Sequence, residues 1–205
     1  LHLDGALLLP AFVDGHVHTT DTGLMLAGLD LTGVRSKTEL LDLVAQRTKQ
    51  LRGRTVLGHG WDETTWPVRD LPTAAELDRA SYGSLVYLSR VDVHSALVSG
   101  AMLASTPQAE GLEGWSADGW VRREAHNAIR GTALGTVTGT QTTEVQRLAL
   151  RAAAAHGIAA VHEMAGPDIS GEDDAASLVA RARSEDLPEV TVYWGQLAST
   201  GGLDV

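Results

Sequence analysis

The sequence contains no cysteine and no long apolar run. Because cysteine is absent, disulfide bonds and thiolate metal ligands are excluded, and a reducing compartment such as the cytoplasm suits the composition. A membrane-spanning helix needs about 20 consecutive apolar residues, and no stretch of the chain approaches that length. We therefore expect a cytoplasmic protein that has no membrane partner.

Positive charge is also scarce. The 205 residues include 16 lysines and arginines against 26 acidic residues, which gives a formal net charge of −10 at pH 7. A surface of this sign repels phosphate backbones, so we expect no nucleic-acid partner. With 43% hydrophobic residues the chain can bury a sizeable core, and we expect residues 1–205 to form a single domain.

An apolar run that ends in two histidines is the most informative stretch of the sequence. Leu7–Val13 leads into Asp14-Gly15-His16-Val17-His18. Side chains alternate along a strand, so His16 and His18 would lie on the same face, with their backbones roughly 6–7 Å apart. Two imidazoles at the end of one strand can bind one metal ion, at zinc–nitrogen distances of about 2.0–2.1 Å. The alternative is a pair of polar residues at a strand end that bind nothing.

Other hydrolase and nucleotide-binding motifs are missing. The metallo-β-lactamase pattern HxHxDH fails, because Thr20 stands where aspartate belongs and Asp21 where histidine belongs. The sequence also lacks the phosphate loop GxxxxGK(S/T), the nucleophile elbow GxSxG and a GxGxxG after a strand. These absences leave the histidine pair as the main indication of chemistry.

Strands and helices alternate in the expected secondary structure. The capping patterns Ser36-x-x-Glu39 and Thr73-x-x-Glu76 predict two helix starts, and further helices are expected over residues 95–104, 143–156 and 172–183. Expected strands cover residues 12–18, 54–60, 85–89, 158–162 and 190–194. Residues 106–140 are rich in glycine and tryptophan, and we expect a loop-rich insertion there with one hairpin near 119–122. The alternation favours an α/β fold with a parallel sheet covered by helices.

The histidine stretch resembles a family signature. Leu9–His18, LPAFVDGHVH, is similar to the first-strand signature PGxxDxHxH of the amidohydrolase superfamily, with Ala11 where glycine is usual. Gly58–Asp62 and Arg90–Leu97 are similar to segments of the amidohydrolase family 3 branch, which includes N-substituted formamide deformylases. The resemblance implies a (β/α)8 TIM barrel with its active site at the carboxyl ends of the strands. Because family members are longer and the chain has no initiator methionine, we expect a fragment that forms the N-terminal part of such a barrel.

The resemblance also implies a reaction. Members of the family hydrolyse C–N bonds, such as those of amides and formamides, with a divalent metal. His16 and His18 match the first two metal ligands of the family; zinc is the expected metal, and iron or manganese would also suit. A small molecule would be the substrate, and Trp61, Asp62 and His94 are expected to bind it. The alternatives are a packed turn for Trp61 and Asp62, and the start of a helix for His94.

The chain does not supply the full ligand set of the family. The remaining ligands are usually a carboxylated lysine or a glutamate, two further histidines and an aspartate. The two lysines, Lys37 and Lys49, lie on an expected helix, and no histidine follows His162. His162, at the end of an expected strand, is the candidate for one extra ligand; the alternative is a histidine that binds no metal. We expect the active site to be incomplete in this chain.

Two functions remain open from the sequence. The first is a metal-dependent amidohydrolase, of which this chain is the first part. The second is a non-catalytic remnant of a barrel, or an oligomerising module. A partial barrel leaves sheet edges unpaired, so we expect either a homo-oligomer or a partly disordered C-terminal end.

Overall fold

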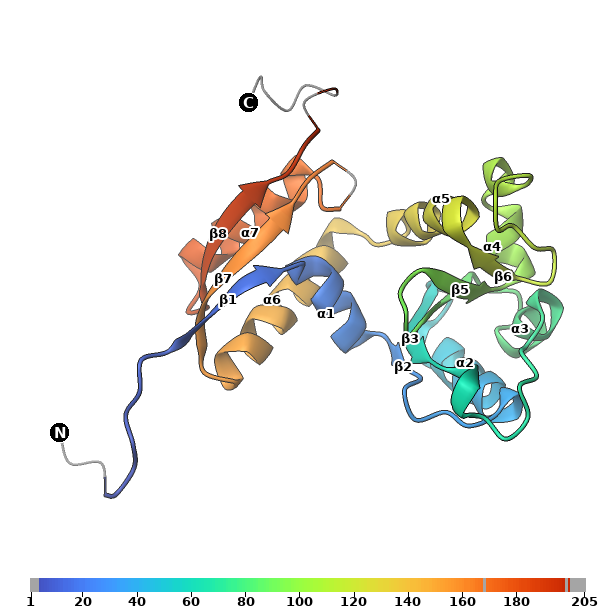
Figure 1. Ribbon diagram of the computed structural model, residues 1–205, viewed down its shortest axis with the longest axis horizontal. Coiled ribbons are helices and arrows are strands. Elements are labelled where there is room, and N and C mark those ends of the chain that lie inside the picture. The colour runs from blue at the N-terminus through green and yellow to red at the C-terminus, as the bar shows by residue number, and fades with distance from the viewer. Residues whose placement is uncertain (1–3, 168, 198, 200–205) are drawn as a thin grey trace. The chain divides into compact units, whose positions relative to one another are not determined.

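A computed structural model describes residues 4–167, 169–197 and 199 of the chain (Figure 1). The chain folds into two compact units. The first unit combines residues 1–26 with residues 139–205, and the second contains residues 27–138. The second unit is therefore an insertion between two segments of the first. That residues 1–205 act together as a single domain of a barrel stays a prediction.

The first unit contains a three-stranded parallel sheet. Its strands are β1 (Phe12–Val17), β7 (Ile158–Ala165) and β8 (Glu189–Trp194), in the order β1-β7-β8. Its helices are α1 (Thr19–Ala27), α6 (Gly139–Ala155) and α7 (Glu172–Ser184). β7, α7 and β8 follow one another as a strand, a crossover helix and a parallel strand, as the alternation of elements predicts. The α/β fold with parallel strands is confirmed, and the partial barrel stays a prediction.

One face of this sheet is packed against helices. Its core consists of Leu150, Val161 and Leu178, bordered by Val17, Ala153, Ile158, Leu187 and Val190. Because side chains alternate along a strand, His162 lies on the other face, where its ring is 5.2 Å from that of Tyr193. Tyr193 is 49% exposed. Within the first unit, α6 and α7 thus pack against one face of the sheet, and His162 lies on the opposite face (Figure 1).

The second unit contains a five-stranded mixed sheet. Its strands, in sheet order, are β2 (Leu29–Asp30), β3 (Val56–Trp61), β4 (Val86–Arg90), β5 (Ser95–Val98) and β6 (Trp120–Arg122). β2, β3 and β4 are parallel, whereas β5 and β6 continue the sheet as antiparallel strands. Its helices are α2 (Lys37–Leu51), α3 (Ala74–Ala80), α4 (Gly100–Ala104) and α5 (Arg123–Gly135), with 3-10 turns η1 (Glu63–Thr65) and η2 (Pro107–Ala109).

Two hydrophobic cores lie on the two faces of this sheet. The first core includes Leu31, Leu40, Val44, Trp61, Leu77, Val86 and Leu88. The second includes Tyr87, Ala96, Val98, Met102, Val121 and Ile129. Along β4 the side chains of Val86 and Leu88 enter the first core and that of Tyr87 enters the second, as strand alternation requires. β4 is therefore the central strand of this unit, buried on both faces.

The predicted helix starts at Ser36 and Thr73 are confirmed. The Ser36 hydroxyl accepts a hydrogen bond from the Glu39 amide at 3.2 Å. At Thr73 the capping box is complete, because Glu76 also accepts the Thr73 amide at 2.8 Å. Each cap satisfies amides of a first turn that have no partner inside the helix. None of the helices in the described part of the chain is both long enough and apolar enough to cross a membrane.

Two predictions about the second unit are wrong. The sequence predicts a helix over 95–104, but β5 comes first and α4 begins only after Ser99, whose hydroxyl accepts the Met102 amide at 3.2 Å. The sequence predicts a loop-rich insertion over 106–140, but α5 occupies Arg123–Gly135 and the expected hairpin strand is β6, paired with β5. Of the four buried residues of α5, two are alanine and one is histidine, so the sequence offers few large apolar side chains at helical spacing.

Apart from α1, which is not among the helices expected from the sequence, the differences in the first unit concern element boundaries. The strands expected over 12–18 and 190–194 and the helix expected over 172–183 are present as β1, β8 and α7. α6 begins at Gly139, four residues before the predicted start at Thr143. β7 continues to Ala165, so His162 lies inside the strand rather than at its end. The extra residues of β7 pair with both β1 and β8, and these tertiary hydrogen bonds are invisible to local sequence patterns.

A tyrosine–histidine pair is buried in the second core. The hydroxyl of Tyr87 on β4 lies 2.7 Å from Nε2 of His126 on α5, and both residues are buried. With a neutral imidazole, the tyrosine O–H donates to Nε2. Burial lowers the pKa of His126; a hydrogen bond with Asn127 opposes this effect, and the charge of Arg130 adds to it.

His126 is expected to make the second unit less stable in acid. Unfolded chains bind a proton here near pH 6.5, whereas the folded chain does so only at lower pH. The stabilisation is therefore complete above pH 6.5 and is lost as the pH falls through the lower folded pKa, by at most about 1.4 kcal/mol per pH unit. Urea unfolding between about pH 7.5 and about pH 5.5 should show a smaller pH dependence for His126→Gln than for the parent and for the exposed control His156→Gln. Equal slopes in all three would contradict this assignment.

Candidate functional site

The two histidines of the opening strand lie on the same side of β1. His16 is exposed within the strand, and His18 is half-buried directly after its carboxyl end. The centroids of their rings are 5.4 Å apart, and the ring planes make an angle of 85°. The predicted placement of both side chains on one face is confirmed. Their role as metal ligands stays a prediction.

The ring of His18 is held by the neighbouring strand. Its Nδ1 atom lies 2.9 Å from the carbonyl oxygen of Met164 on β7. Because a carbonyl can only accept, Nδ1 carries the hydrogen, and the lone pair of the neutral imidazole is on Nε2. Histidines that bind metals commonly donate their other ring N–H to a carbonyl in this way. His18 therefore has the tautomer and the support that a metal ligand needs.

The backbone around the pair is fixed on both sides. The amide of His16 donates to the carboxylate of Asp14 at 3.1 Å. The carbonyl of His18 accepts the amide of Thr22 at 2.9 Å, so α1 begins directly after His18. The amide of Thr19 donates to the carboxylate of Glu163 on β7 at 2.7 Å. The strand end, the histidine and the helix start are thus one continuous, hydrogen-bonded segment.

His162 does not join the pair. Its ring is tilted against the ring of Tyr193, with the centroids 5.2 Å apart. In the part of the chain that the structure describes, no three histidine, aspartate or glutamate side chains come together as a group that could hold a metal ion. Within the described residues, His16 and His18 are therefore a pair without a third such side chain, and the role of His162 as an extra ligand stays a prediction.

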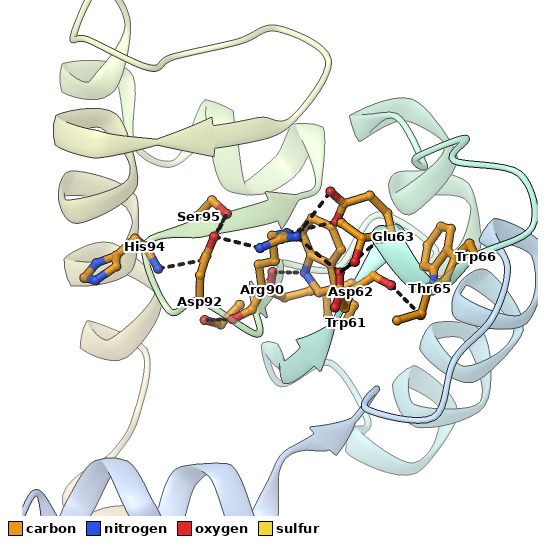
Figure 2. Close-up of polar contacts among 12 residues, drawn as sticks. Trp61, Asp62, Glu63, Thr65, Trp66, Arg90, Asp92, His94 and Ser95 are labelled. Atoms are coloured by element: carbon orange, nitrogen blue, oxygen red, sulfur yellow. Dashed lines mark hydrogen bonds and ion pairs between the residues drawn. The ribbon is translucent and has the colours of Figure 1, made fainter.

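In the second unit, a single arginine connects three acidic side chains (Figure 2). The guanidinium of Arg90, at the end of β4, contacts Glu63 at 2.8 Å, Asp92 at 2.9 Å and Asp62 at 3.2 Å. It also lies 5.8 Å from the centre of the Trp61 ring. The contact with Glu63 is the main cause of the raised pKa of Arg90. This arginine ties the segment after β3 to the turn between β4 and β5.

Trp61 and Asp62 have structural partners at this point. Trp61 is completely buried, and its ring N–H donates to the Leu88 carbonyl at 2.9 Å. Asp62 accepts hydrogen bonds from the hydroxyl and the amide of Thr64, at 2.6 and 3.0 Å, and these bonds lower the pKa of Asp62. Both residues thus stabilise the turn that begins η1. Their binding of substrate stays a prediction.

His94 is exposed at a turn that is stabilised by hydrogen bonds (Figure 2). Asp92 accepts the amide of His94 at 3.0 Å and the hydroxyl of Ser95 at 3.2 Å. Burial would raise the pKa of Asp92, but the His94 amide and Arg90 more than offset this effect, so the pKa is lowered. Val93 has φ of 55°, a conformation that is strained for a β-branched residue. The turn thus presents the His94 ring to solvent, and its contact with substrate stays a prediction.

Sequence reasoning missed a partly buried polar network in the first unit. Asp174 of α7 accepts the Thr20 hydroxyl at 2.9 Å, and the amide group of Gln146 on α6 donates to Asp174 at 3.2 Å. Burial raises the pKa of Asp174, and the nearby charge of Glu163 contributes. This network ties α1 to α6 and α7. Polar residues at the inward positions of amphipathic helices were the available signal.

Comparison with known proteins identifies the family of this chain. A model of the amidohydrolase family matches residues 2–202. Protein LONG AFTER FAR-RED 3 of Arabidopsis thaliana and "Putative amidohydrolase YtcJ" of Bacillus subtilis (strain 168) are each 34% identical to this chain over 104 residues, which is 50% of the chain. The matched region is 18% of the first relative and 20% of the second, so the chain spans only a small part of their length.

Two solved structures have a similar fold. They are uncharacterized metal-dependent hydrolases from Pyrococcus furiosus and Pyrococcus horikoshii OT3, each with a TM-score of 0.71. Their sequence identities to this chain are 25% and 24%; the similarity covers 90% of this chain and 37% and 36% of theirs. The family match extends over nearly the whole sequence, as the resemblance of the opening strand predicts. The chain belongs to the amidohydrolase family.

Proposed function

We propose that this chain provides the first two metal ligands of a hydrolase that cleaves C–N bonds of the amide or formamide type. The observation that carries this proposal is the His16–His18 pair at the carboxyl end of β1, with Nδ1 of His18 bonded to the Met164 carbonyl. Family membership and the similarity to metal-dependent hydrolases support it. The parallel order β1-β7-β8 suits the first part of a (β/α)8 barrel, whose active sites lie at this end of the strands.

The donor set suits a divalent metal. Nε2 of His18 and a ring nitrogen of His16 would bind it; neutral imidazoles suit zinc, and also iron or manganese. A bound metal lowers the pKa of a water molecule and polarises the carbonyl of the substrate. Catalytic zinc normally has three protein ligands, so the complete site requires donors in addition to this pair. The small-molecule substrate would bind at the same end of the strands.

Zinc binding by the 205-residue chain tests the proposal. We expect the parent to bind zinc. His16→Ala or His18→Ala should weaken zinc binding by about 100-fold, because loss of a group that merely supports a ligand already weakens it by about 10- to 100-fold. Competition with a chromophoric chelator measures the dissociation constants. The control is His156→Ala, because His156 is exposed at the end of α6. A parent that binds no zinc, or alanine variants that bind as tightly as the parent, would show that the pair is not a metal site.

An oligomerising module is the second candidate function. The segment before β1 and the start of β1 expose large apolar side chains: Leu7 is 81% exposed, Leu8 74% and Phe12 63%. β1 is also at the edge of its sheet, and exposed apolar edge strands tend to pair with other chains. Under this alternative, light scattering would show a homo-oligomer and elemental analysis would show no bound metal. An oligomer with near-stoichiometric metal would favour the hydrolase.

A further inference from the structure

Glu163 is a buried carboxylate next to the histidine pair. It lies in β7 with 1% of its surface exposed. Oε2 accepts the amide of Thr19 at 2.7 Å, and Oε1 accepts the hydroxyl of Ser170 at 3.3 Å. Val161 and Ala165, two residues away on either side, are buried like Glu163, so its side chain lies on the packed face of the sheet. Glu163 therefore faces away from the side where the rings of His16 and His18 lie.

The partner of Glu163 is the first amide of a helix. Thr19 begins α1, and His18 precedes it with its carbonyl already bonded to the amide of Thr22. The first amides of a helix have no partner inside it, and histidine is not among the residues whose side chains satisfy them well. Here the ring of His18 is turned toward the Met164 carbonyl instead. The Glu163 carboxylate supplies the missing acceptor, and its negative charge is favourable at a helix N-terminus.

Two consecutive residues of β7 thus hold His18 from two directions. The side chain of Glu163 holds the backbone just after His18, and the carbonyl of Met164 holds its ring at Nδ1. The two contacts differ in kind, because Glu163 uses its side chain on the packed face of the sheet and Met164 uses its backbone carbonyl. With the backbone and the ring both fixed, Nε2 of His18 points in one defined direction.

We infer that Glu163 is a positioning residue for metal binding: it fixes the start of α1, and so keeps the His18 ring in the Nδ1–H tautomer with Nε2 free. It acts through Thr19 and is not itself a ligand. The inference rests on the proposed function in one respect, namely that His18 binds the metal. Outer-shell partners of metal ligands typically change metal affinity by about 10- to 100-fold.

The first test replaces Glu163 by glutamine, which keeps the shape and an acceptor oxygen but loses the charge. We expect Glu163→Gln to weaken zinc binding by about tenfold, and to move the metal-free His18 ring from the Nδ1–H toward the Nε2–H tautomer. Nitrogen-15 NMR of the histidine rings measures the tautomer, and chelator competition measures the affinity. The matched control is Glu189→Gln, because Glu189 is exposed at the start of β8; it should behave as the parent in both measurements.

A second pair of variants removes the donor instead of the acceptor. Thr19→Pro deletes the amide that Glu163 binds, and proline is well tolerated at the first position of a helix. Its control, Thr19→Val, keeps the amide and the shape and removes only a hydroxyl that has no hydrogen-bond partner in the described structure. We expect Thr19→Pro to reproduce the tautomer change and the weaker zinc binding, and Thr19→Val to match the parent. These variants decide the question if Glu163→Gln fails to fold.

The outcomes separate this inference from the proposed function. If the parent binds no zinc, the proposed function fails, while the tautomer of metal-free His18 still decides whether Glu163 positions the ring. If the parent binds zinc through His16 and His18, but the folded Glu163→Gln and Thr19→Pro variants keep both the parent tautomer and the parent affinity, the inference is overturned. A change in thermal stability alone, with tautomer and affinity unchanged, also overturns it, since that result assigns Glu163 a purely structural role.

Discussion

Replacing Arg90 with methionine is expected to lower the free energy of unfolding of the second unit by about 3 kcal/mol. Removing one member of a buried ion pair costs about 3–5 kcal/mol, because the partner stays buried without its counter-charge. The side chain of Arg90 is only 15% exposed and faces Glu63, which is 14% exposed. Asp62 and Asp92 are more open to water, and their solvation places the expected loss at the lower end of that range.

Methionine is chosen because it retains most of the apolar stem of arginine and can still pack on the Trp61 ring. The loss then reports the charge and the hydrogen bonds rather than the packing. Urea unfolding followed by tryptophan fluorescence is a suitable measurement, since Trp61, Trp66, Trp115 and Trp120 all belong to the second unit. The matched control is Arg79→Met on α3, where the arginine is exposed; it should change stability by no more than about 0.5 kcal/mol. Equal losses for Arg79→Met and Arg90→Met would contradict the role of the acidic cluster.

The contacts of Arg90 with Asp62, Glu63 and Asp92 also show how much a sequence motif can predict. Trp61, Asp62 and His94 were selected because their segments resemble those of a hydrolase family. In the structure, Trp61 is a buried anchor and Asp62 a cap, whereas His94 is exposed. Arg90 and Glu63, which connect these segments, are 27 residues apart in the sequence. A resemblance thus identifies the segment, and the three-dimensional contacts decide which of its side chains are free to meet a ligand.

Local patterns predicted those elements whose signals are local. The alternation in β1 placed His16 and His18 on one face, and the caps at Ser36 and Thr73 marked two helix starts. α5 was missed because only one of its four buried residues, Ile129, is a large apolar side chain. The extension of β7 beyond His162 depends on pairing with strands far away in the sequence. The insertion of a second unit after Leu26 has no local signal at all.

The final prediction concerns the contact between α1 and α6. Gly23 is buried in α1, and a Cβ atom added there would overlap the backbone carbonyl of Val145 on α6 and come within 2.9 Å of its Cβ. Alanine favours helices over glycine by about 1 kcal/mol, but a backbone atom cannot rotate away as a flexible side chain can. Overpacking of this kind costs about 1–3 kcal/mol and occasionally more. We therefore expect Gly23→Ala to destabilise the first unit by about 3 kcal/mol.

The matched control, Gly131→Ala, is expected to change stability in the opposite direction. Gly131 lies within α5, and nothing lies within 4 Å of an added Cβ, so Gly131→Ala should stabilise its helix by about 0.5–1 kcal/mol. Hydrogen exchange with mass spectrometry resolves α1 and α5 separately, and should show faster exchange in the first variant and slower exchange in the second. If α1 exchanges as in the parent, the close packing of α1 on α6 is not needed for stability.

Because α1 begins at Thr19, whose amide is bonded to Glu163, a shift of α1 in Gly23→Ala should also weaken zinc binding at His18. The packing of α1 on α6 would then contribute to the geometry of the histidine pair.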